Sequence, residues 1–274
     1  MGIHCGARYP VPPRTGGWSD ARSPAAGGAP RATVTHLNRR AGPLKDAIER
    51  CREHFRMIEG GPDDIAGALP TAALPPPEAT EPPKVWEWFD FVCPFCYVGQ
   101  DRSELLRRGG FAVVELPFRS HPQLPVEGIS AGPRDSPLYR GLELEAKSVG
   151  LPLRWPSRIP RSETALATVE WARRRQPSTF RTLFDAFFRA HFVLGEDIGD
   201  VQVVRRYAEG AGLDFDAIYL EIRQGWEPDL IRRSEDRARS IGVPGTPSWL
   251  IGNQLLIGLQ PRSAFERIVT ASKK

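Results

Sequence analysis

A run of apolar residues that leads directly into two cysteines constrains this chain most. Residues 85–92 read VWEWFDFV, which is aromatic and β-branched and predicts a buried strand. The motif C-P-F-C follows at residues 93–96, and the chain then has the pattern of a helix that ends at the glycine pair 109–110. A second strand-like run, FAVVELPFRS, comes next. A strand, a helix and a strand with short joints predict a βαβ unit in an α/β fold.

The middle of the chain is predicted to be helical. Residues 121–160 are rich in proline around one helical stretch, SPLYRGLELEAKSVG, and residues 162–230 have helical periodicity throughout. Ser162 stands where an N-cap is expected, with Glu163 in the first turn. Four phenylalanines recur at helical spacing between residues 180 and 188, a pattern that favours a core over a cofactor site.

The C-terminal part returns to strands. A last helix is expected at 229–241, and SWLIG and LLIGL then predict a hairpin joined by Asn253 and Gln254. RSAFERIVTASKK predicts a closing helix. We therefore expect a core of residues 84–122 and 231–274, interrupted by a helical insertion of about 123–230.

Residues 1–83 differ from the rest in composition. Gly, Pro, Ala and Arg dominate residues 1–43, which predicts a largely disordered segment. LKDAIERCREHFRMI at 44–58 predicts one short helix with Cys51 on its apolar face, and the Gly- and Pro-rich stretch after it predicts a stiff linker. The folded domain is expected to begin near Lys84.

Charge and hydropathy limit the expected partners. The net charge is +4, but the arginines are scattered among acidic residues and no lysine-rich tract occurs, so we expect no nucleic-acid partner. No apolar run approaches the length of a transmembrane helix, and the N-terminus lacks the apolar segment of a secretory signal. We expect a cytoplasmic protein without a membrane partner, either a monomer or a homodimer.

The two cysteines of the C-P-F-C motif form the candidate chemical site. A helix N-terminus presents unpaired N–H groups and the positive end of the dipole, and both stabilise a thiolate. Cys93 meets these groups, so we expect it to be the nucleophile, and Cys96, one turn later, should resolve a mixed disulfide. Pro94 suits the first helical turn, where its missing N–H is not needed.

Zinc binding is the competing interpretation of these cysteines. A structural zinc site needs four ligands, and Cys51 and His54 could supply the other two. Residues 88–96 lack the turn glycines of a zinc knuckle, and the cysteine pair opens a helix, so we expect no metal. Two inert thiols are a further alternative.

A second short motif precedes the hairpin. Gly245-Thr246-Pro247-Ser248 places a proline at the head of a strand, which is allowed there. A cis Thr246–Pro247 bond would suit a tight turn, although a trans loop proline is the commoner case.

Together, WFDFVCPFCYVG and GVPGTPSWLIGNQLLIGLQP resemble the DsbA family of thioredoxin-fold oxidoreductases, in particular its FrnE-type branch. That branch is similar to the 2-hydroxychromene-2-carboxylate isomerases and the kappa-class glutathione transferases. RSETALATVEWAR and FRAHFVLGEDIGD also resemble segments of this branch. The resemblance covers about Lys84 to Lys274 and implies a thioredoxin-like fold with an all-helical insertion domain.

The resemblance implies roles for single residues. Cys93 matches the nucleophilic cysteine and Cys96 the resolving one. Pro247 matches the cis-proline that faces the disulfide, and Thr246 the residue whose backbone pairs with the substrate chain.

Three neighbouring residues have implied roles as well. Pro94 and Phe95 form the variable dipeptide at the substrate-binding surface, which tunes the redox potential. Phe95 cannot stabilise a thiolate as a cationic histidine would, so a moderate oxidant is expected. Asp90, three residues before Cys93, is expected to assist proton transfer to Cys96; its alternative role is to bond a backbone N–H at the end of the strand.

Two departures separate this chain from the isomerases and transferases: a second cysteine, which favours redox exchange, and Arg161, which argues against their small-substrate contacts. Those relatives usually have serine where Cys93 stands, and they often have asparagine where Arg161 stands. We therefore expect a thiol–disulfide oxidoreductase without a cofactor, acting on protein or small-molecule thiols and disulfides. The alternatives are a glutathione-dependent isomerase or transferase of a small aromatic substrate, and a non-catalytic adaptor.

Overall fold

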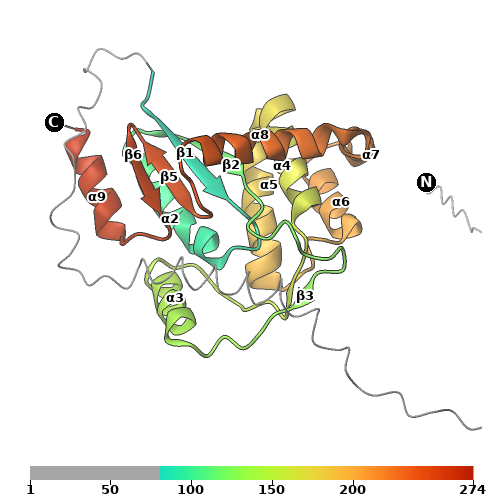
Figure 1. The fold of residues 1–274 in the computed structure, drawn as a ribbon, viewed down its shortest axis with the longest axis horizontal. Helices are drawn as coiled ribbons and strands as arrows, with labels where there is room; N and C mark the ends of the chain where they lie inside the picture. The colour runs from blue at the N-terminus through green and yellow to red at the C-terminus, as the bar shows by residue number, and fades with distance from the viewer. Residues whose placement is uncertain (1–80, 274) are drawn as a thin grey trace, which may run out of the picture. The chain divides into compact units, whose positions relative to one another are not determined.

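A computed structural model of the chain describes residues 81–273, without the side chains of residues 226–228. The predicted disordered segment and its short helix lie outside the described residues. Four strands form the central sheet, in the order β2-β1-β5-β6 (Figure 1). They are β1 (Lys84–Phe89), β2 (Ala112–Pro117), β5 (Ser248–Ile251) and β6 (Gln254–Ile257).

The predicted βαβ unit is confirmed. Strands β1 and β2 are parallel, and α2 (Pro94–Arg108) connects them. The predicted first strand was too long, because it ends at Phe89 and not at residue 92. The Asp90 carbonyl accepts a hydrogen bond from the Cys93 N–H, and this turn stops the strand just before the helix.

The predicted hairpin is also confirmed, with its joint one residue earlier. Strands β5 and β6 are antiparallel, and Gln254 already pairs with Ile251. The turn therefore consists of Gly252 and Asn253, and Gly252 has a positive φ of 58° that favours glycine. Strand β5 lies antiparallel to β1, which places the start of the hairpin beside the end of β1.

The region between β2 and β5 is mostly helical, as predicted. Its helices are α3 (Pro137–Ser148), α4 (Glu163–Arg175), α5 (Pro177–Arg189), α6 (Val201–Gly210), α7 (Phe215–Glu221) and α8 (Glu227–Ser240). Two π-helical turns were not predicted, η1 (Ala190–Leu194) and η2 (Ile222–Trp226). A pair of two-residue antiparallel strands, β3 (Ile129–Ser130) and β4 (Arg158–Ile159), was not predicted either.

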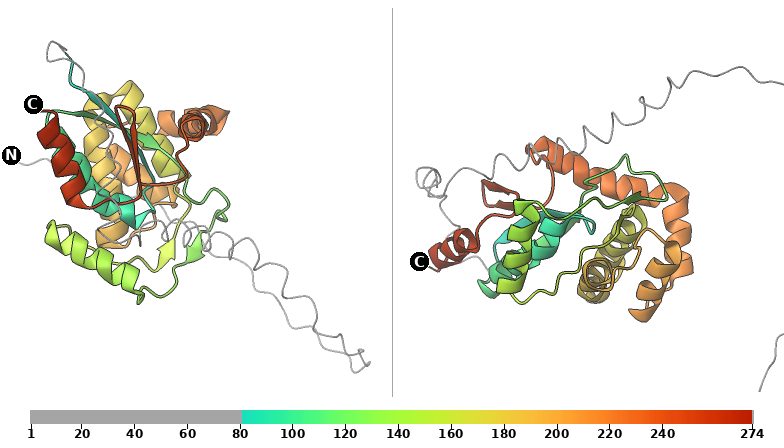
Figure 2. Two further views of the ribbon diagram at one scale, coloured as in Figure 1. Left: turned by 60° about the vertical axis from the view of Figure 1, so that its left-hand side comes forward. Right: turned by 90° about the horizontal axis from the view of Figure 1, so that it is seen from below.

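Helices cover both faces of the sheet (Figures 1 and 2). On one face, α2 and the closing helix α9 (Arg262–Ala271) enclose the buried rings of Trp249 and Phe265, whose centroids are 5.1 Å apart. On the other face, Trp88 packs against Ala238 of α8. Residue 231, where we placed the boundary between insertion and core, lies inside α8, so that division stays a prediction.

The phenylalanines of α5 form the core beneath the cysteine motif, as predicted. Phe184 lies 4.8 Å from Phe89, and Phe188 lies 4.9 Å from Phe91, measured between ring centroids. Phe91 belongs to the turn that leads into the motif, so its packing against Phe188 fixes the position of this turn on α5. Within residues 81–273, no helix is both long enough and apolar enough to cross a membrane.

Candidate active site

The two cysteines occupy the start of α2. Cys93 is the N-cap residue with extended backbone angles, and Pro94 takes the first helical position. The Cys96 N–H donates a hydrogen bond to the Cys93 sulfur over 3.4 Å, as an N-cap side chain requires. Both thiols are free and buried, with 8% of Cys93 and 1% of Cys96 exposed. Cys93 is therefore the more exposed residue of the two.

The pKa values of the two thiols shift in opposite directions. Burial raises the pKa of Cys93, but hydrogen bonds with the Cys96 thiol, with Thr246 and with the Cys96 N–H outweigh burial, so the pKa falls below its ordinary value. Burial, the hydrogen bond to Cys93 and the charge of Cys93 all raise the pKa of Cys96. This asymmetry makes Cys93 the more acidic thiol of the two and Cys96 the one that keeps its proton to higher pH.

The loop before β5 closes over Cys93. The Thr246–Pro247 peptide bond is cis, and the Cys93 thiol lies 3.4 Å from the Thr246 carbonyl oxygen, to which it can donate. The Pro247 carbonyl accepts a hydrogen bond from the Gly258 N–H over 2.8 Å, and the Ser248 hydroxyl donates to the Gly245 carbonyl over 2.8 Å. The hairpin thus holds the loop against the cysteines. Sequence analysis paired these two motifs only through a resemblance, and the structure brings them into contact.

Asp90 is buried between four segments of the chain. One carboxylate oxygen accepts a hydrogen bond from the Ser162 hydroxyl (2.7 Å) and from the Val92 N–H (3.3 Å), and the other accepts from the Ser120 N–H (2.8 Å). Burial raises the pKa of Asp90, and the hydrogen bonds and the nearby His121 lower it in part. The structure shows the backbone-bonding role; the proton-transfer role stays a prediction.

The structure corrects the expected cap at Ser162. Ser162 is the N-cap residue of α4, but its side chain makes no cap hydrogen bond. Its backbone angles are helical, with φ −87° and ψ 0°, whereas a capping side chain needs an extended backbone. The hydroxyl donates to Asp90 instead. Glu163 in the first turn pairs with Arg119 and Arg161.

Ser120 was missed by sequence analysis. Its hydroxyl lies 2.7 Å from the Thr246 hydroxyl, and its N–H bonds Asp90. A single serine after a strand gives no signal in the sequence. The only available clue was topological, because β1 and β2 are parallel and the residues that follow them must meet at the same edge of the sheet.

Glu87 is the second residue that was missed. It is buried in the middle of β1, where its carboxylate accepts a hydrogen bond from the Ser103 hydroxyl over 2.6 Å. The Ser103 oxygen in turn accepts from the Trp249 indole N–H over 2.9 Å. Burial, followed by the negative charge of Glu115 on the paired strand, raises the pKa of Glu87 to about 7. An acid inside an otherwise apolar run was the signal that could have found it.

Phe95 and Pro94 are half-buried beside the cysteines, and Phe95 packs against the helical core. Their contact with a substrate stays a prediction. Arg161 stands where relatives often have asparagine. Its guanidinium forms an ion pair with the Glu163 carboxylate, with 2.6 Å between nitrogen and oxygen.

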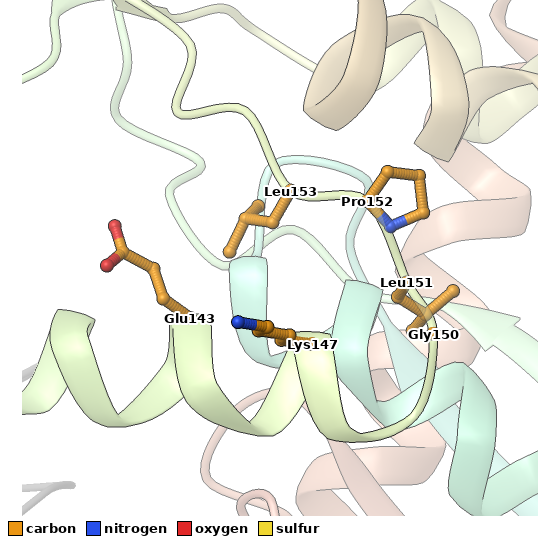
Figure 3. Close-up of a pocket in the computed structure, with 6 residues that line it drawn as sticks. All are labelled: Glu143, Lys147, Gly150, Leu151, Pro152 and Leu153. Atoms are coloured by element: carbon orange, nitrogen blue, oxygen red, sulfur yellow. The ribbon is translucent and has the colours of Figure 1, made fainter.

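A surface pocket of about 510 Å³ lies between α3 and the segment that follows it (Figure 3). Glu143 and Lys147 line it from α3, and residues 150–153 line the other side. Neither cysteine contributes to its wall, so we assign the pocket no part in the dithiol chemistry.

The zinc alternative is not tested, because Cys51 and His54 lie outside the described residues. Between residues 81 and 273, no three His, Cys, Asp or Glu side chains are grouped so that they could hold a metal ion.

Comparison with known proteins agrees with this architecture. The model of the DSBA-like thioredoxin domain matches residues 84–269. A 2-hydroxychromene-2-carboxylate isomerase from Sphingobium xenophagum is 27% identical over 182 residues, which cover 62% of this chain and 90% of the relative. Among solved structures, a probable DsbA oxidoreductase from Streptomyces coelicolor is similar, with a TM-score of 0.60, 24% identity and coverage of 70% of this chain and 90% of that one.

A further solved structure is the cytosolic disulfide reductase DsbM from Pseudomonas aeruginosa with GSH. It is 15% identical, with a TM-score of 0.54, and the similarity covers 70% of this chain and all of that one. At these identities the solved structures support the fold alone. The domain match spans well over half of the chain, and the protein therefore belongs to the family of DSBA-like thioredoxin domains.

Proposed function

We propose that this protein is a thiol–disulfide oxidoreductase that works through Cys93 and Cys96. The opposite shifts of the two thiol pKa values are the observation that supports it best. An enzyme of this kind needs one thiolate that attacks and one thiol that stays protonated until the second step.

The reaction has two steps. The Cys93 thiolate attacks one sulfur of a substrate disulfide, the substrate S–S bond breaks, and the other sulfur leaves as a thiolate that takes up a proton. Cys96 then gives up its proton and attacks the Cys93 sulfur, which releases the second substrate thiol and leaves a disulfide between Cys93 and Cys96. Two electrons pass to the substrate. The reverse sequence oxidises a substrate dithiol.

Three neighbouring groups complete the proposed site. Asp90 is proposed to accept the proton of Cys96, since it is a buried carboxylate with a raised pKa. The Thr246 backbone is proposed to bind the substrate chain, with Pro247 facing the sulfur atoms. The Thr246 carbonyl already faces the Cys93 thiol, which supports this placement.

The substrates are proposed to be protein disulfides or small thiols such as glutathione. The DsbM structure is that of a cytosolic disulfide reductase with GSH, and by analogy with that protein we propose glutathione as a partner and the cytoplasm as the location. No further cofactor is part of the proposed reaction.

The relative from Sphingobium xenophagum favours a second candidate, a glutathione-dependent isomerase or transferase of a small aromatic substrate. Such an enzyme activates glutathione and does not need a resolving thiol. Its activity would survive Cys96→Ala and would require glutathione.

Two variants of the full chain test the proposed function. Cys93→Ser should lower disulfide turnover by about 100-fold or more, because an alcohol is not an effective nucleophile here. Cys96→Ser should accumulate a mixed disulfide at Cys93, read by mass spectrometry of the peptide that contains this residue. Unchanged turnover in Cys93→Ser would refute the proposal, whereas full activity of Cys96→Ser with glutathione would support the second candidate.

A further inference from the structure

A chain of hydrogen bonds connects Cys93 to the helical region through side chains that sequence analysis did not place together. The Cys93 thiol donates to the Thr246 carbonyl (3.4 Å), and the Thr246 hydroxyl lies 2.7 Å from that of Ser120. The Ser120 N–H donates to Asp90 (2.8 Å), and the Ser162 hydroxyl donates to the other oxygen of the same carboxylate (2.7 Å). This series of hydrogen bonds joins the starts of α2 and α4, the segment after β2 and the loop before β5.

Burial makes each of these bonds significant. Asp90, Ser162 and Thr246 are all buried, and a buried polar group that loses its partner is costly because no water replaces that partner. Ser162 donates to Asp90 at the expense of the cap that it would otherwise give α4. A serine that caps a helix normally stabilises it, and here the Ser162 hydroxyl bonds Asp90 instead of the helix N-terminus.

We propose that Ser120 and Ser162 are positioning residues of the dithiol site, where Ser162 holds the Asp90 carboxylate and Ser120 fixes Thr246 relative to that carboxylate and to Cys93. This inference rests on the proposed function. It assigns to the helical region a direct influence on the reactive sulfur.

The two serines act on different links, so their effects are separable. Ser120 binds Asp90 through its backbone N–H and Thr246 through its hydroxyl. Ser120→Ala therefore removes the link to Thr246 and keeps the link to Asp90. Ser162 binds Asp90 through its hydroxyl, so Ser162→Ala removes only that link.

The effect of Ser162→Ala has a defined sign. The Ser162 hydrogen bond lowers the pKa of Asp90, so its loss leaves Asp90 neutral over a wider range of pH. The charge of Asp90 raises the pKa of Cys93, so a neutral Asp90 makes Cys93 more reactive at low pH. A variant whose only fault is loose packing would expose the buried Cys93 thiol and be alkylated faster at every pH, whereas a neutral Asp90 shifts the midpoint of alkylation to lower pH.

Other charged groups around Asp90 do not reverse this sign. His121 interacts with Asp90, and burial lowers the pKa of its imidazole, which favours the neutral form. Arg119, next to Ser120, is paired with Glu163 and Glu235 at 2.9 and 2.8 Å. None of these pairs involves the hydroxyl that Ser162→Ala removes.

The first test measures alkylation of Cys93 between pH 5 and 8 in the full-length reduced protein, read by mass spectrometry at the peptide with Cys93. Ser162→Ala should be alkylated about two- to fivefold faster near pH 6, the size expected from one screened charge. Ser162→Thr keeps the hydroxyl and should match the parent protein. Ser178→Ala, an exposed serine of α5, is the matched control.

Equal or slower alkylation of folded Ser162→Ala would overturn the role of Ser162. If this variant does not fold, Asp90→Asn removes the same charge and must show the same gain. An ordinary alkylation profile in the parent protein, without disulfide turnover, would refute the proposed function itself. An active parent protein with an unresponsive Ser162→Ala would refute the inference alone.

The second test concerns Ser120 and Thr246. Ser120→Ala and Thr246→Val each remove one hydroxyl of the same contact and should each lower turnover about three- to tenfold. Turnover in the double variant should be no lower than in the less active single variant, because the two residues share one interaction. If the two losses of turnover multiply in the double variant, the proposed role of Ser120 is overturned.

Discussion

Glu87 shows how one residue can affect the stability of the whole core. Its carboxylate is buried, bonds Ser103, and lies beside Glu115 on the paired strand. Glu115 is itself paired with Arg107 and Arg181, so its negative charge is compensated from two sides. Within residues 81–273 Glu87 forms no ion pair, although the charges of Arg107 and Arg181 lower its pKa in part. Burial is the main reason that this pKa is raised to about 7.

This carboxyl predicts a stability that depends on pH. The pKa of Glu87 is about 7 in the folded protein and 4.5 for the unperturbed group, so its favourable contribution is complete below pH 4.5 and is lost as pH rises through 7. Glu87→Gln keeps an oxygen that can accept from Ser103 and removes the ionisation. The variant should therefore gain stability relative to the parent by on the order of 2 kcal/mol between pH 5 and pH 8.

Urea denaturation of both proteins at pH 5 and pH 8 measures this difference. Glu104→Gln, a half-exposed acid of α2, is the control and should change little. A difference in unfolding free energy between Glu87→Gln and the parent that is the same at both pH values would contradict the account.

At the scale of elements, the sequence predicted what hydrophobic periodicity controls. The βαβ unit, the hairpin and the helices of the insertion follow from local patterns, and all are present. The π-helical turns and the two-residue strands β3 and β4 could not be predicted, because they arise where tertiary contacts override the local pattern. Ser162 illustrates the reason: its sequence context favours a cap, but the buried Asp90 takes its hydroxyl.

The candidate site was predictable to the same extent. Cys93 and Cys96 were found from a short motif, and Asp90 and Thr246 through the family resemblance, whereas Ser120 required knowledge of which strand ends meet. Glu87 was visible as an acid in an apolar run, but its partners on α2 and β5 are too distant in sequence to be deduced.

The aromatic packing of α5 makes a prediction at this scale. Phe184 is buried and lies within 5.7 Å of the rings of Phe89, Phe91 and Phe188. Phe184→Ala should cost about 3–5 kcal/mol of unfolding free energy, through lost burial and the cavity that remains. Chemical denaturation measures the loss, and Ser178→Ala on the exposed side of the same helix should change stability by about 0.5 kcal/mol or less. A cost below about 1 kcal/mol would show that α5 does not pack on the turn before Cys93 as described.

At the scale of the whole molecule, the dithiol lies where the sheet and the helical region meet. Phe91 and the α5 rings join the two below the motif, and the Asp90–Ser162 contact joins them beside it. Arg119 adds a third connection, since it follows β2 and pairs with Glu163 of α4 and Glu235 of α8. The proposed role of Ser162 would make the helical region part of the environment that sets the reactivity of Cys93.

The central claim is that this environment activates Cys93 and not Cys96. The most direct test is the pH dependence of alkylation of each thiol in the reduced full-length protein, followed separately at the two residues by mass spectrometry. The structure predicts a midpoint for Cys93 below that of an ordinary free cysteine, and slow alkylation of Cys96 throughout. A midpoint for Cys93 at or above that value, or equal reactivity of the two thiols, would contradict the account.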